Sequence, residues 1–225
     1  MKPLTEEHLA IFRRQMVEVI DIEFDLLSDE IGRDRLGDAT REAFLKVPRH
    51  LFVPQQLAAF SYQNQPLPIG FDKTISQPFI AALMIELLDI RSGDRALEIG
   101  TGLGYQAAIL AELAEQVWSV EIVEEFAAVA APQLRDLGYD KVVVRVGDGS
   151  RGWPEQAPFD IILVTAAAKQ LPPALFAQLA AGGRMVLPLV ENEVQQLTRV
   201  EKLANGELRT QTIMPVRFTE LETVF

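Results

Sequence analysis

The stretch Arg95-Ala-Leu-Glu-Ile-Gly-Thr-Gly-Leu-Gly-Tyr105 determines the fold that we expect for this chain. Its first half has the apolar composition of a short buried strand, and three glycines then follow at alternate positions. A helical pattern rich in alanine and leucine begins directly afterwards. Glycine allows a ligand to approach the bare backbone, and the first N–H groups of a helix point toward such a ligand. A strand, a glycine loop and a helix in this order therefore predict a nucleotide-type binding site at the end of the strand.

Two acidic residues accompany the glycines. Glu98 lies at the end of the first strand, and a second strand, Val117-Trp-Ser-Val-Glu121, also ends in an acid. Glu121 comes about 20 residues after the first glycine, where a carboxylate is suited to accept hydrogen bonds from ribose hydroxyls. The spacing Gly-x-Gly-x-Gly differs from the Gly-x-Gly-x-x-Gly of dinucleotide sites. The alternative to a ligand site is a glycine-rich turn that binds nothing.

The rest of the chain after residue 95 alternates regularly between strands and helices. Strands are expected at 95–99, 117–121, 142–146, 159–165 and 184–189, and helices at 103–114, 124–137 and 173–181, with Gly138 and Gly182 as helix C-caps. Only a loop or short helix is expected around 151–156. Two further segments, 195–204 and 207–216, flank Asn205-Gly206, a strong hairpin signal. We therefore expect an α/β fold with a Rossmann-like, doubly wound, mostly parallel sheet that ends in an antiparallel hairpin.

The first part of the chain reads as helices without a sheet. An amphipathic helix is expected over 6–27, with its apolar side formed by Leu9, Phe12, Met16, Val19, Ile20 and Phe24. A second helix is expected over 39–47 with Asp38 as its cap, and a third over 54–60. A loop rich in proline and glycine, 61–78, then leads to a helix over 79–88, and Ser76 stands where an N-cap would stand. We expect residues 1–78 to form a helical extension and covering segment, and 79–225 to form the ligand-binding core of one compact unit.

Composition excludes several classes of function. The 225 residues include 21 basic and 32 acidic side chains, so the formal net charge of −11 argues against binding to nucleic acid. There is no cysteine, and His8 and His50 lack the spacing of metal ligands, so no metal is expected. The first residues are charged where a signal peptide needs an apolar core, and no apolar run approaches the ~20 residues of a membrane span. These features predict a cytoplasmic protein without membrane contact and do not indicate an oligomeric state.

Candidate ligand contacts gather at the ends of four expected strands. The first strand contributes Glu98 and the glycine loop, and the second contributes Glu121. The third ends in Gly147-Asp148-Gly149, where the aspartate could accept a hydrogen bond from an adenine amino group. The fourth ends in Thr165-Ala-Ala-Ala168, whose small side chains leave room for a ligand. In open parallel sheets ligands bind beyond these carboxyl ends, so all four features are expected at one edge.

Several of these stretches resemble known enzymes. The glycine loop with its two acids looks like the S-adenosylmethionine site of Rossmann-like methyltransferases. More specifically, the order and spacing from about Val47 to Val216 resemble bacterial-type protein-L-isoaspartate O-methyltransferases. The stretches that carry this resemblance are Val47-Pro-Arg-His-Leu-Phe-Val-Pro54, Pro66-Leu-Pro-Ile-Gly70, Thr74-Ile-Ser-Gln-Pro78, Leu97 to Tyr105, Gly147 to Gly149, Phe159 to Ala168 and Gly182 to Pro188.

The resemblance implies a reaction and a set of site residues. The reaction is methylation of the free α-carboxylate of L-isoaspartyl residues in damaged proteins, with S-adenosylmethionine converted to S-adenosylhomocysteine, as the first step of repair to aspartate. A carboxylate acceptor is already ionised at neutral pH, so no general base is needed. By position, Ser76 resembles the active-site serine. The implied cofactor contacts are Ile75, Glu98, Gly100, Thr101, Gly102, Gly104, Glu121, Ile122, Asp148, Gly149 and Thr165.

Three departures from the family pattern and two other functions remain open at this point. Val190 stands where members usually have glycine, Lys169 stands where they have proline, and the first 45 or so residues are less typical. The first alternative function is a carboxyl methyltransferase that acts on another peptide or a small molecule. The second is a module that binds the cofactor without turnover. For Ser76 itself, the alternative to a catalytic role is a helix cap.

Overall fold

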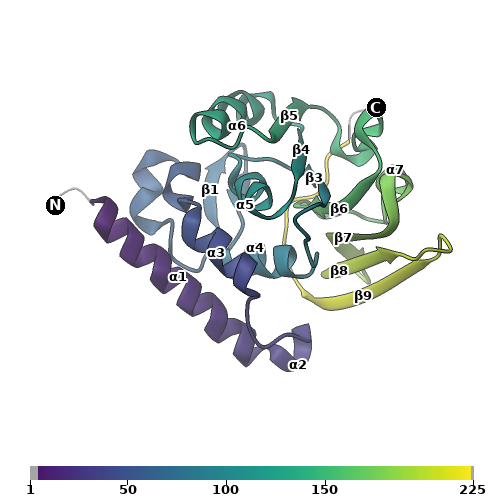
Figure 1. Cartoon of the computed structure of the whole chain (residues 1–225), viewed down its shortest axis with the longest axis horizontal. Helices are drawn as coiled ribbons and strands as arrows, with labels where there is room; N and C mark the ends of the chain where they lie inside the picture. Colours follow the sequence, from purple (N-terminus) through teal and green to yellow (C-terminus); the bar gives the residue numbers. More distant parts are fainter. Residues whose placement is uncertain (1–4, 224–225) are drawn as a thin grey trace.

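Seven strands form one sheet in the order β5-β4-β3-β6-β7-β8-β9 in the computed structural model, which describes residues 5–223 (Figure 1). The first five run parallel: β3 (Arg95–Ile99), β4 (Gln116–Glu121), β5 (Val142–Val146), β6 (Phe159–Val164) and β7 (Leu179–Glu191). The last two, β8 (Val194–Lys202) and β9 (Leu208–Pro215), are antiparallel and meet at Asn205-Gly206. The mostly parallel sheet with a terminal hairpin is therefore confirmed.

The strand order brings the glycine loop to the point where the direction of winding reverses. β3 pairs with β4 on one side and with β6 on the other. The loops that follow β3 and β6 consequently diverge, which leaves a crevice at the carboxyl edge of the sheet. Glu98, Glu121 and Thr165, which are far apart in sequence, lie at or just beyond the ends of these three adjacent strands.

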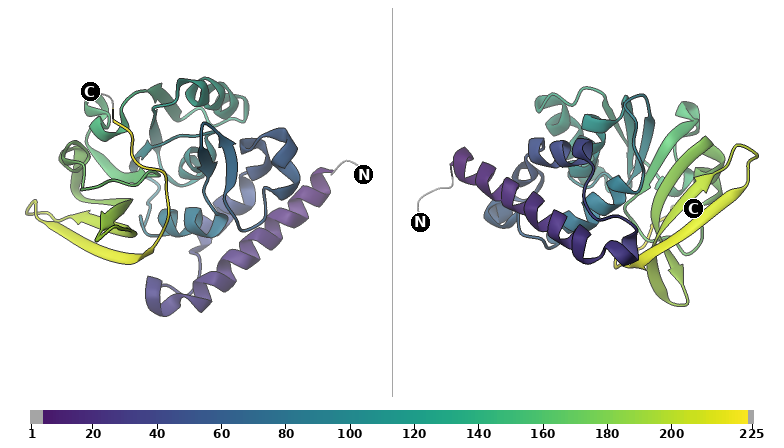
Figure 2. Two further views of the ribbon diagram at one scale, coloured as in Figure 1. Left: turned by 180° about the vertical axis from the view of Figure 1, so that it is seen from behind. Right: turned by 60° about the horizontal axis from the view of Figure 1, so that its bottom comes forward.

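One face of the sheet is covered by two layers of helix. α4 (Pro78–Glu86) and α5 (Tyr105–Leu113) are apolar on all sides, as expected for helices enclosed by protein. α1 (Glu6–Leu26) packs on α4, and α3 (Asp38–Lys46) packs on both α4 and α5, so that these N-terminal helices form the outer layer (Figures 1 and 2). One continuous apolar cluster joins Phe24 and Phe44 of the outer layer to Ala96 and Ile161 in the sheet.

The other face is covered more thinly. A second cluster includes Leu97, Trp118, Ile162 and Leu175 of α7 (Pro173–Gln178). Trp153 and Ala157 pack against it; they flank the 3₁₀ turn η4 (Pro154–Gln156), which follows a similar turn, η3 (Gly149–Arg151). α6 (Glu124–Asp136) flanks β4 and β5 and directs Ala130 and Leu134 into the first cluster. Successive residues of β3 and β6 alternate between the two clusters, as the pleat of a strand requires.

The prediction of a loop over 61–78 is wrong in one part, because this stretch contains a small antiparallel hairpin. β1 (Leu67–Gly70) pairs with β2 (Lys73–Ile75) in a sheet of its own. The turn between them places Phe71 and Asp72 at positive φ, +49° and +54°. Residues with side chains seldom adopt this conformation, and the stretch lacks the Asn-Gly signature that normally marks such a turn. A contact with another element accompanies this turn: the Phe71 ring lies edge-on to the ring of Phe126 in α6, with 5.3 Å between the ring centres.

Several predicted helix features also differ from the structure. Asp38 is the first residue of α3 and does not cap it; Gly37 holds the N-cap position. Gly182 is not a C-cap, because α7 already ends at Gln178 and the glycine lies inside β7. A one-turn helix, α2 (Ser28–Ile31), follows α1 where the sequence predicted no helix. The third helix expected over 54–60 is present as the 3₁₀ helix η2 (Gln55–Phe60), and a further 3₁₀ helix, η1 (Arg49–Phe52), was not predicted.

The apolar side of α1 is rotated from the predicted one. Leu9, Met16, Ile20 and Phe24 are buried as expected, together with Val17, whereas Phe12 and Val19 are exposed. Within residues 5–223, no helix is long and apolar enough to cross a membrane.

A buried ion pair joins the end of α4 to the sheet. Arg184 of β7 donates a hydrogen bond to Asp94 at 2.5 Å and two more to the carbonyls of Leu88 and Asp89, at 2.8 and 2.9 Å. Both side chains of the pair are less than a tenth exposed. The pair fixes the turn that leads into β3, and thereby the start of the strand that carries the glycine loop.

We expect Asp94→Asn to lower the free energy of unfolding by about 3 kcal/mol, because the buried guanidinium of Arg184 loses its only charged partner among the described residues. Urea unfolding of the two proteins measures the difference. Asp89→Asn is the matched control: it removes the same charge from a side chain that is 42% exposed, and should cost less than about 1 kcal/mol. Equal losses in the two variants would contradict a special role for the buried pair.

Candidate active site

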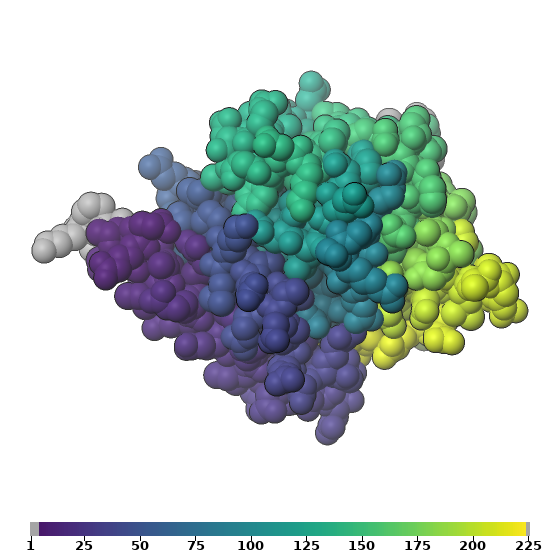
Figure 3. Space-filling view, viewed as in Figure 1, coloured from purple at the N-terminus to yellow at the C-terminus, as the bar shows by residue number. Residues whose placement is uncertain are grey.

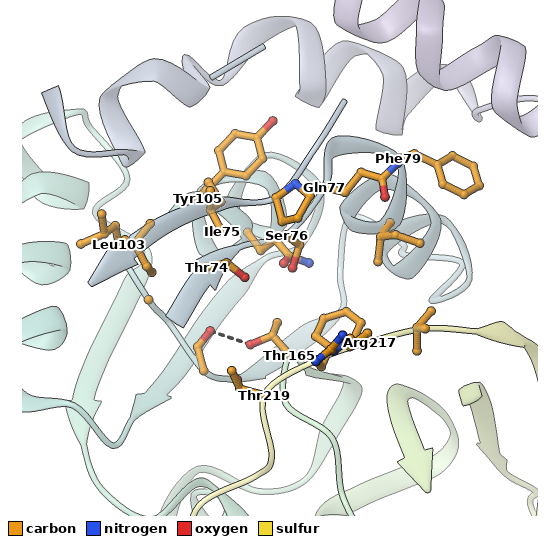
Figure 4. A pocket seen from close by; sticks show the side chains of 18 of the residues that line it. Thr74, Ile75, Ser76, Gln77, Phe79, Leu103, Tyr105, Thr165, Arg217 and Thr219 are labelled. Atoms are coloured by element: carbon orange, nitrogen blue, oxygen red, sulfur yellow. Dashed lines mark hydrogen bonds between the residues drawn. The ribbon is translucent and has the colours of Figure 1, made fainter. Parts of the chain in front are cut away.

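Two adjoining cavities open at the carboxyl edge of the sheet. The larger, of about 990 Å³, is lined by the segment from β1 to the start of α4, by the glycine loop and by residues 214–219 after β9 (Figure 4). The smaller, of about 90 Å³, extends toward the end of β4. Both are lined by Ile69, Thr74, Gly100, Gly102, Thr165 and Thr219. The larger volume lies at the upper end of the range for small-molecule sites.

The glycine loop is shaped by close neighbours. Gly100 has a φ of +93°, and a Cβ there would lie 2.2 Å from the Thr165 hydroxyl oxygen. That hydroxyl can donate a hydrogen bond to the carbonyl of Ile99 or of Gly100, at 3.0 and 2.9 Å. Gly104 has a φ of +96°, and a Cβ would lie 3.1 Å from Leu134 of α6. Gly100 therefore forms the cavity wall, whereas Gly104, which is not part of either lining, allows α5 to start close to α6.

Glu98 is fully buried beneath the larger cavity. Its Oε2 accepts a hydrogen bond from the Ser119 hydroxyl at 2.5 Å, and that hydroxyl lies 2.5 Å from the one of Thr101. Its Oε1 is buried and has no partner among the described residues, and Glu98 belongs to the lining of the larger cavity. Burial, together with the smaller effect of the nearby Glu121 charge, raises the pKa of Glu98 to about 8, although the hydrogen bond from Ser119 opposes the shift. A buried polar atom without a partner at a cavity wall indicates a missing ligand group or water.

Glu121 holds two backbone turns together. Its Oε2 accepts a hydrogen bond from the Gly102 N–H at 2.7 Å, and its Oε1 accepts one from the Val123 N–H at 2.9 Å. Glu121 lines the smaller cavity together with Ile122 and Gly149. Each carboxylate oxygen can accept a second hydrogen bond, so the predicted contact with a ribose stays compatible with this arrangement.

Asp148 has a structural function that the sequence analysis did not predict. Its Oδ1 accepts hydrogen bonds from the N–H and hydroxyl of Ser150, so that Asp148 caps η3. Its Oδ2 lies 3.5 Å from the Arg151 Nε. Asp148 is not part of either cavity lining. The neighbouring Gly149 does line the smaller cavity, and a Cβ there would lie 2.3 Å from Ile99. The adenine contact proposed for Asp148 stays a prediction.

Ser76 does not cap α4, so the alternative interpretation of this residue is wrong. Gln77 is the N-cap residue, and no cap hydrogen bond comes from its side chain. Asn64 instead accepts a hydrogen bond from the Phe79 N–H at 3.0 Å, a contact across 15 residues that local spacing could not reveal. Ser76 lines the larger cavity next to Ile75 and Gln77 (Figure 4).

Arg49 fixes the segment that carries Ser76. Its Nη2 donates to the Ser76 carbonyl at 2.6 Å and its Nε donates to the Ser61 carbonyl at 2.8 Å. The guanidinium is completely buried, 4.9 Å from the centre of the Tyr105 ring. Burial lowers the pKa of Arg49 to about 10, so it remains charged at neutral pH. The sequence analysis noted the stretch around Arg49 but gave this residue no function.

Other cavity residues were also missed. Tyr105 and Gln106 are the first residues of α5, and Arg217 and Thr219 belong to the segment after the final hairpin. That segment has no recognisable motif, and only its path across the sheet edge brings it to the site (Figure 2). Lys169 and Val190, the two departures from the family pattern, line neither cavity. Within residues 5–223, no group of three or more His, Cys, Asp or Glu residues is placed to hold a metal ion.

A doubly wound sheet with a glycine loop at its switch point, a buried acid below that loop and a second acid bound to it defines a Rossmann-like methyltransferase. The chain matches the family model described as protein-L-isoaspartate(D-aspartate) O-methyltransferase over residues 25–223. It therefore belongs to the protein-L-isoaspartate O-methyltransferase family.

Individual members and solved structures with this name are similar to the chain over most of its length. The chain is 48% identical to protein-L-isoaspartate O-methyltransferase 1 of Polaromonas sp. (strain JS666), over 97% of this chain and 93% of that protein. A solved protein-L-isoaspartate O-methyltransferase has a TM-score of 0.79 and 28% identity; the alignment covers 92% of this chain but only 65% of that longer one. A putative protein-L-isoaspartate O-methyltransferase from Plasmodium falciparum, solved with S-adenosyl-L-homocysteine, shares the fold with a TM-score of 0.78 and 21% identity. The alignment covers 93% of this chain and 98% of that one.

The buried Glu98 makes a prediction about pH. Because its pKa rises from 4.5 to about 8 on folding, the folded protein retains a proton that the unfolded chain loses in that interval. The free energy of unfolding should therefore fall, relative to a Glu98→Gln variant that cannot titrate, as pH rises from about 4.5 to about 8. Urea unfolding at several pH values measures this, with the exposed Glu115→Gln as a control for the loss of one carboxylate. Parallel curves for the wild type and Glu98→Gln would contradict it.

Proposed function

We propose that the chain transfers a methyl group from S-adenosylmethionine to the free α-carboxylate of L-isoaspartyl residues in proteins and peptides. This proposal rests on the family match and on the position of two family-specific stretches in the structure. The two stretches most selective for the family, Thr74-Ile-Ser-Gln-Pro78 and Thr165-Ala-Ala-Ala168, lie far apart in sequence. Residues of both line the larger cavity, together with the glycine loop. The curated relatives with this activity in their names match the chain over nearly its whole length.

The site has features that fit the cofactor. The unpartnered Oε1 of Glu98 is available to a hydrogen-bond donor, and the absence of side chains at Gly100 and Gly102 leaves the loop backbone open to a ligand. S-adenosylmethionine, when bound, supplies an electrophilic methyl group on a sulfonium. We assign contacts to Ile75, Glu98, Gly100, Thr101, Gly102 and Thr165 in the larger cavity, and to Glu121, Ile122 and Gly149 in the smaller one.

The protein's own contribution to this reaction is alignment and exclusion of water. An ionised carboxylate needs no base, so the rate depends on holding its oxygen in line with the methyl group. The Ser76 hydroxyl has no hydrogen-bond partner within residues 5–223, and its backbone is held at the cavity wall by Arg49. We assign to this hydroxyl the hydrogen bond that orients the acceptor carboxylate. The family match favours this reaction over methylation of another carboxylate or binding without turnover.

The proposed function is tested with two peptides that differ only in an L-isoaspartyl or an L-aspartyl residue. We expect methyl transfer, followed by methanol release, with the isoaspartyl peptide alone. Transfer to the aspartyl peptide or to other carboxylates would favour a broader carboxyl methyltransferase. Tight cofactor binding without transfer to either peptide would favour a binding module.

Ser76→Ala separates orientation of the substrate from stability. Since Ser76 caps nothing, the free energy of unfolding should change by less than about 0.5 kcal/mol. Loss of the orienting contact should lower methyl transfer to the isoaspartyl peptide by about 10- to 100-fold. Turnover per folded, cofactor-saturated enzyme is compared with the thermal midpoint, and Ser92→Ala, in the exposed turn before β3, serves as the control. Wild-type turnover in a stable Ser76→Ala protein would remove Ser76 from the proposed site.

A further inference from the structure

The charges that line the larger cavity are unevenly distributed. Among the described residues of its wall, the acids are Glu23, Asp72 and Glu98, and the one basic residue is Arg217. The whole chain carries a net charge of −11. Because burial raises the pKa of Glu98 to about 8, its carboxyl is mostly protonated at neutral pH. Among the described residues, Arg217 is the single lining group with a charge opposite to that of an approaching carboxylate.

The guanidinium of Arg217 is not used by the fold. No other residue within 5–223 forms a hydrogen bond or ion pair with its side chain. The same is true of four other exposed arginines, but among the described residues Arg217 is the only arginine that lines either cavity. Arg217 is exposed, so it lies at the mouth of the cavity and not at its floor. Figure 4 shows it across the open space from Ser76 and Gln77, on the opposite wall.

The backbone that carries Arg217 is nevertheless held on both sides. Before it, the Val216 N–H donates to the Gln195 carbonyl at 2.9 Å. After it, the side-chain amide of Gln195 donates to the Phe218 carbonyl at 3.0 Å and accepts from the Phe218 N–H at 2.6 Å. Further along, the Ala167 N–H donates to the Thr219 carbonyl and the Leu221 N–H donates to the Ala167 carbonyl, both at 2.8 Å. These bonds tie the segment to β8 and to the loop after β6. The backbone from which the Arg217 side chain extends is thus held at the mouth of the site.

We propose that Arg217 is a substrate-binding residue that pairs with the α-carboxylate of the isoaspartyl residue while Ser76 orients it from the opposite wall. This inference rests on the proposed function. A guanidinium binds carboxylates with directional, charge-assisted hydrogen bonds. Contact with one carboxylate oxygen leaves the other free to attack the methyl group. The exposed position of Arg217 suits a polypeptide substrate, whereas the buried Glu98 and the glycine loop lie deeper, where the cofactor is assigned.

The test uses an isoaspartyl peptide with an acetylated N-terminus, an amidated C-terminus and no other acidic residue, so that the acceptor is its only carboxylate. We expect Arg217→Gln to lower kcat/KM for this peptide by about ten-fold at low salt, mainly through KM. The defect should shrink as salt is raised from 0.05 to 0.5 M, because screening removes the wild-type advantage. Arg217→Lys should recover part of the loss, and KM for S-adenosylmethionine should stay unchanged. Arg91→Gln, at the opposite edge of the sheet, removes the same charge and should behave as wild type.

The outcomes distinguish this inference from the function on which it rests. If the wild type methylates the capped peptide and Arg217→Gln equals Arg91→Gln, the assignment of Arg217 is wrong while the proposed function stands. A rise in KM for S-adenosylmethionine instead of the peptide would reassign Arg217 to the cofactor. A defect that appears only with peptides carrying additional acidic residues would place its contact outside the acceptor. An inactive wild type would overturn both proposals.

Discussion

The site depends on the hydrogen bonds that the Glu121 carboxylate accepts from the N–H groups of Gly102 and Val123. The backbone after β3 takes positive φ angles at three alternate positions, a path that side chains would obstruct and that has no regular ladder to stabilise it. The carboxylate at the end of the adjacent strand supplies the missing acceptors. One acid thereby fixes both the glycine loop and the turn into α6, and its own position follows from the pairing of β3 with β4.

The active-site wall is completed by contacts between segments that are distant in sequence. Arg49 holds the carbonyl of Ser76, Asn64 caps the helix that follows, and Gln195 holds the backbone at Phe218. Each of these side chains satisfies backbone groups that no regular element would pair. The covering segment and the C-terminal segment therefore keep defined positions although neither belongs to the main sheet. Their opposed positions leave a cavity between them (Figure 4). Figure 3 shows the other side of the molecule, on which the N-terminal helices lie.

The polarity of the cavity changes from floor to mouth. At the floor, the fully buried Glu98 offers an oxygen without a partner, and at the mouth Arg217 offers an unpaired cation. Under the proposed function, S-adenosylmethionine binds at the floor beside Glu98, which is mostly protonated at neutral pH because its pKa is raised to about 8. The negatively charged acceptor enters past the guanidinium. Such a distribution would favour the orientation in which the two reactants neutralise each other during transfer, because a site with few water molecules strengthens each of these interactions.

The sequence by itself determined the sheet, the glycine loop and the terminal hairpin, because local signals specify them: apolar strands, glycines where φ is positive, and Asn205-Gly206 at the turn. It also placed Glu98, Glu121 and Thr165 at one edge, since consecutive parallel strands end together. It could not determine that Asn64 and not Ser76 caps α4, or that Phe71 and Asp72 form a hairpin turn. Only the tertiary structure decided these features, and the arrival of Arg217 at the cavity, because each depends on a contact or close packing between segments that local spacing does not encode.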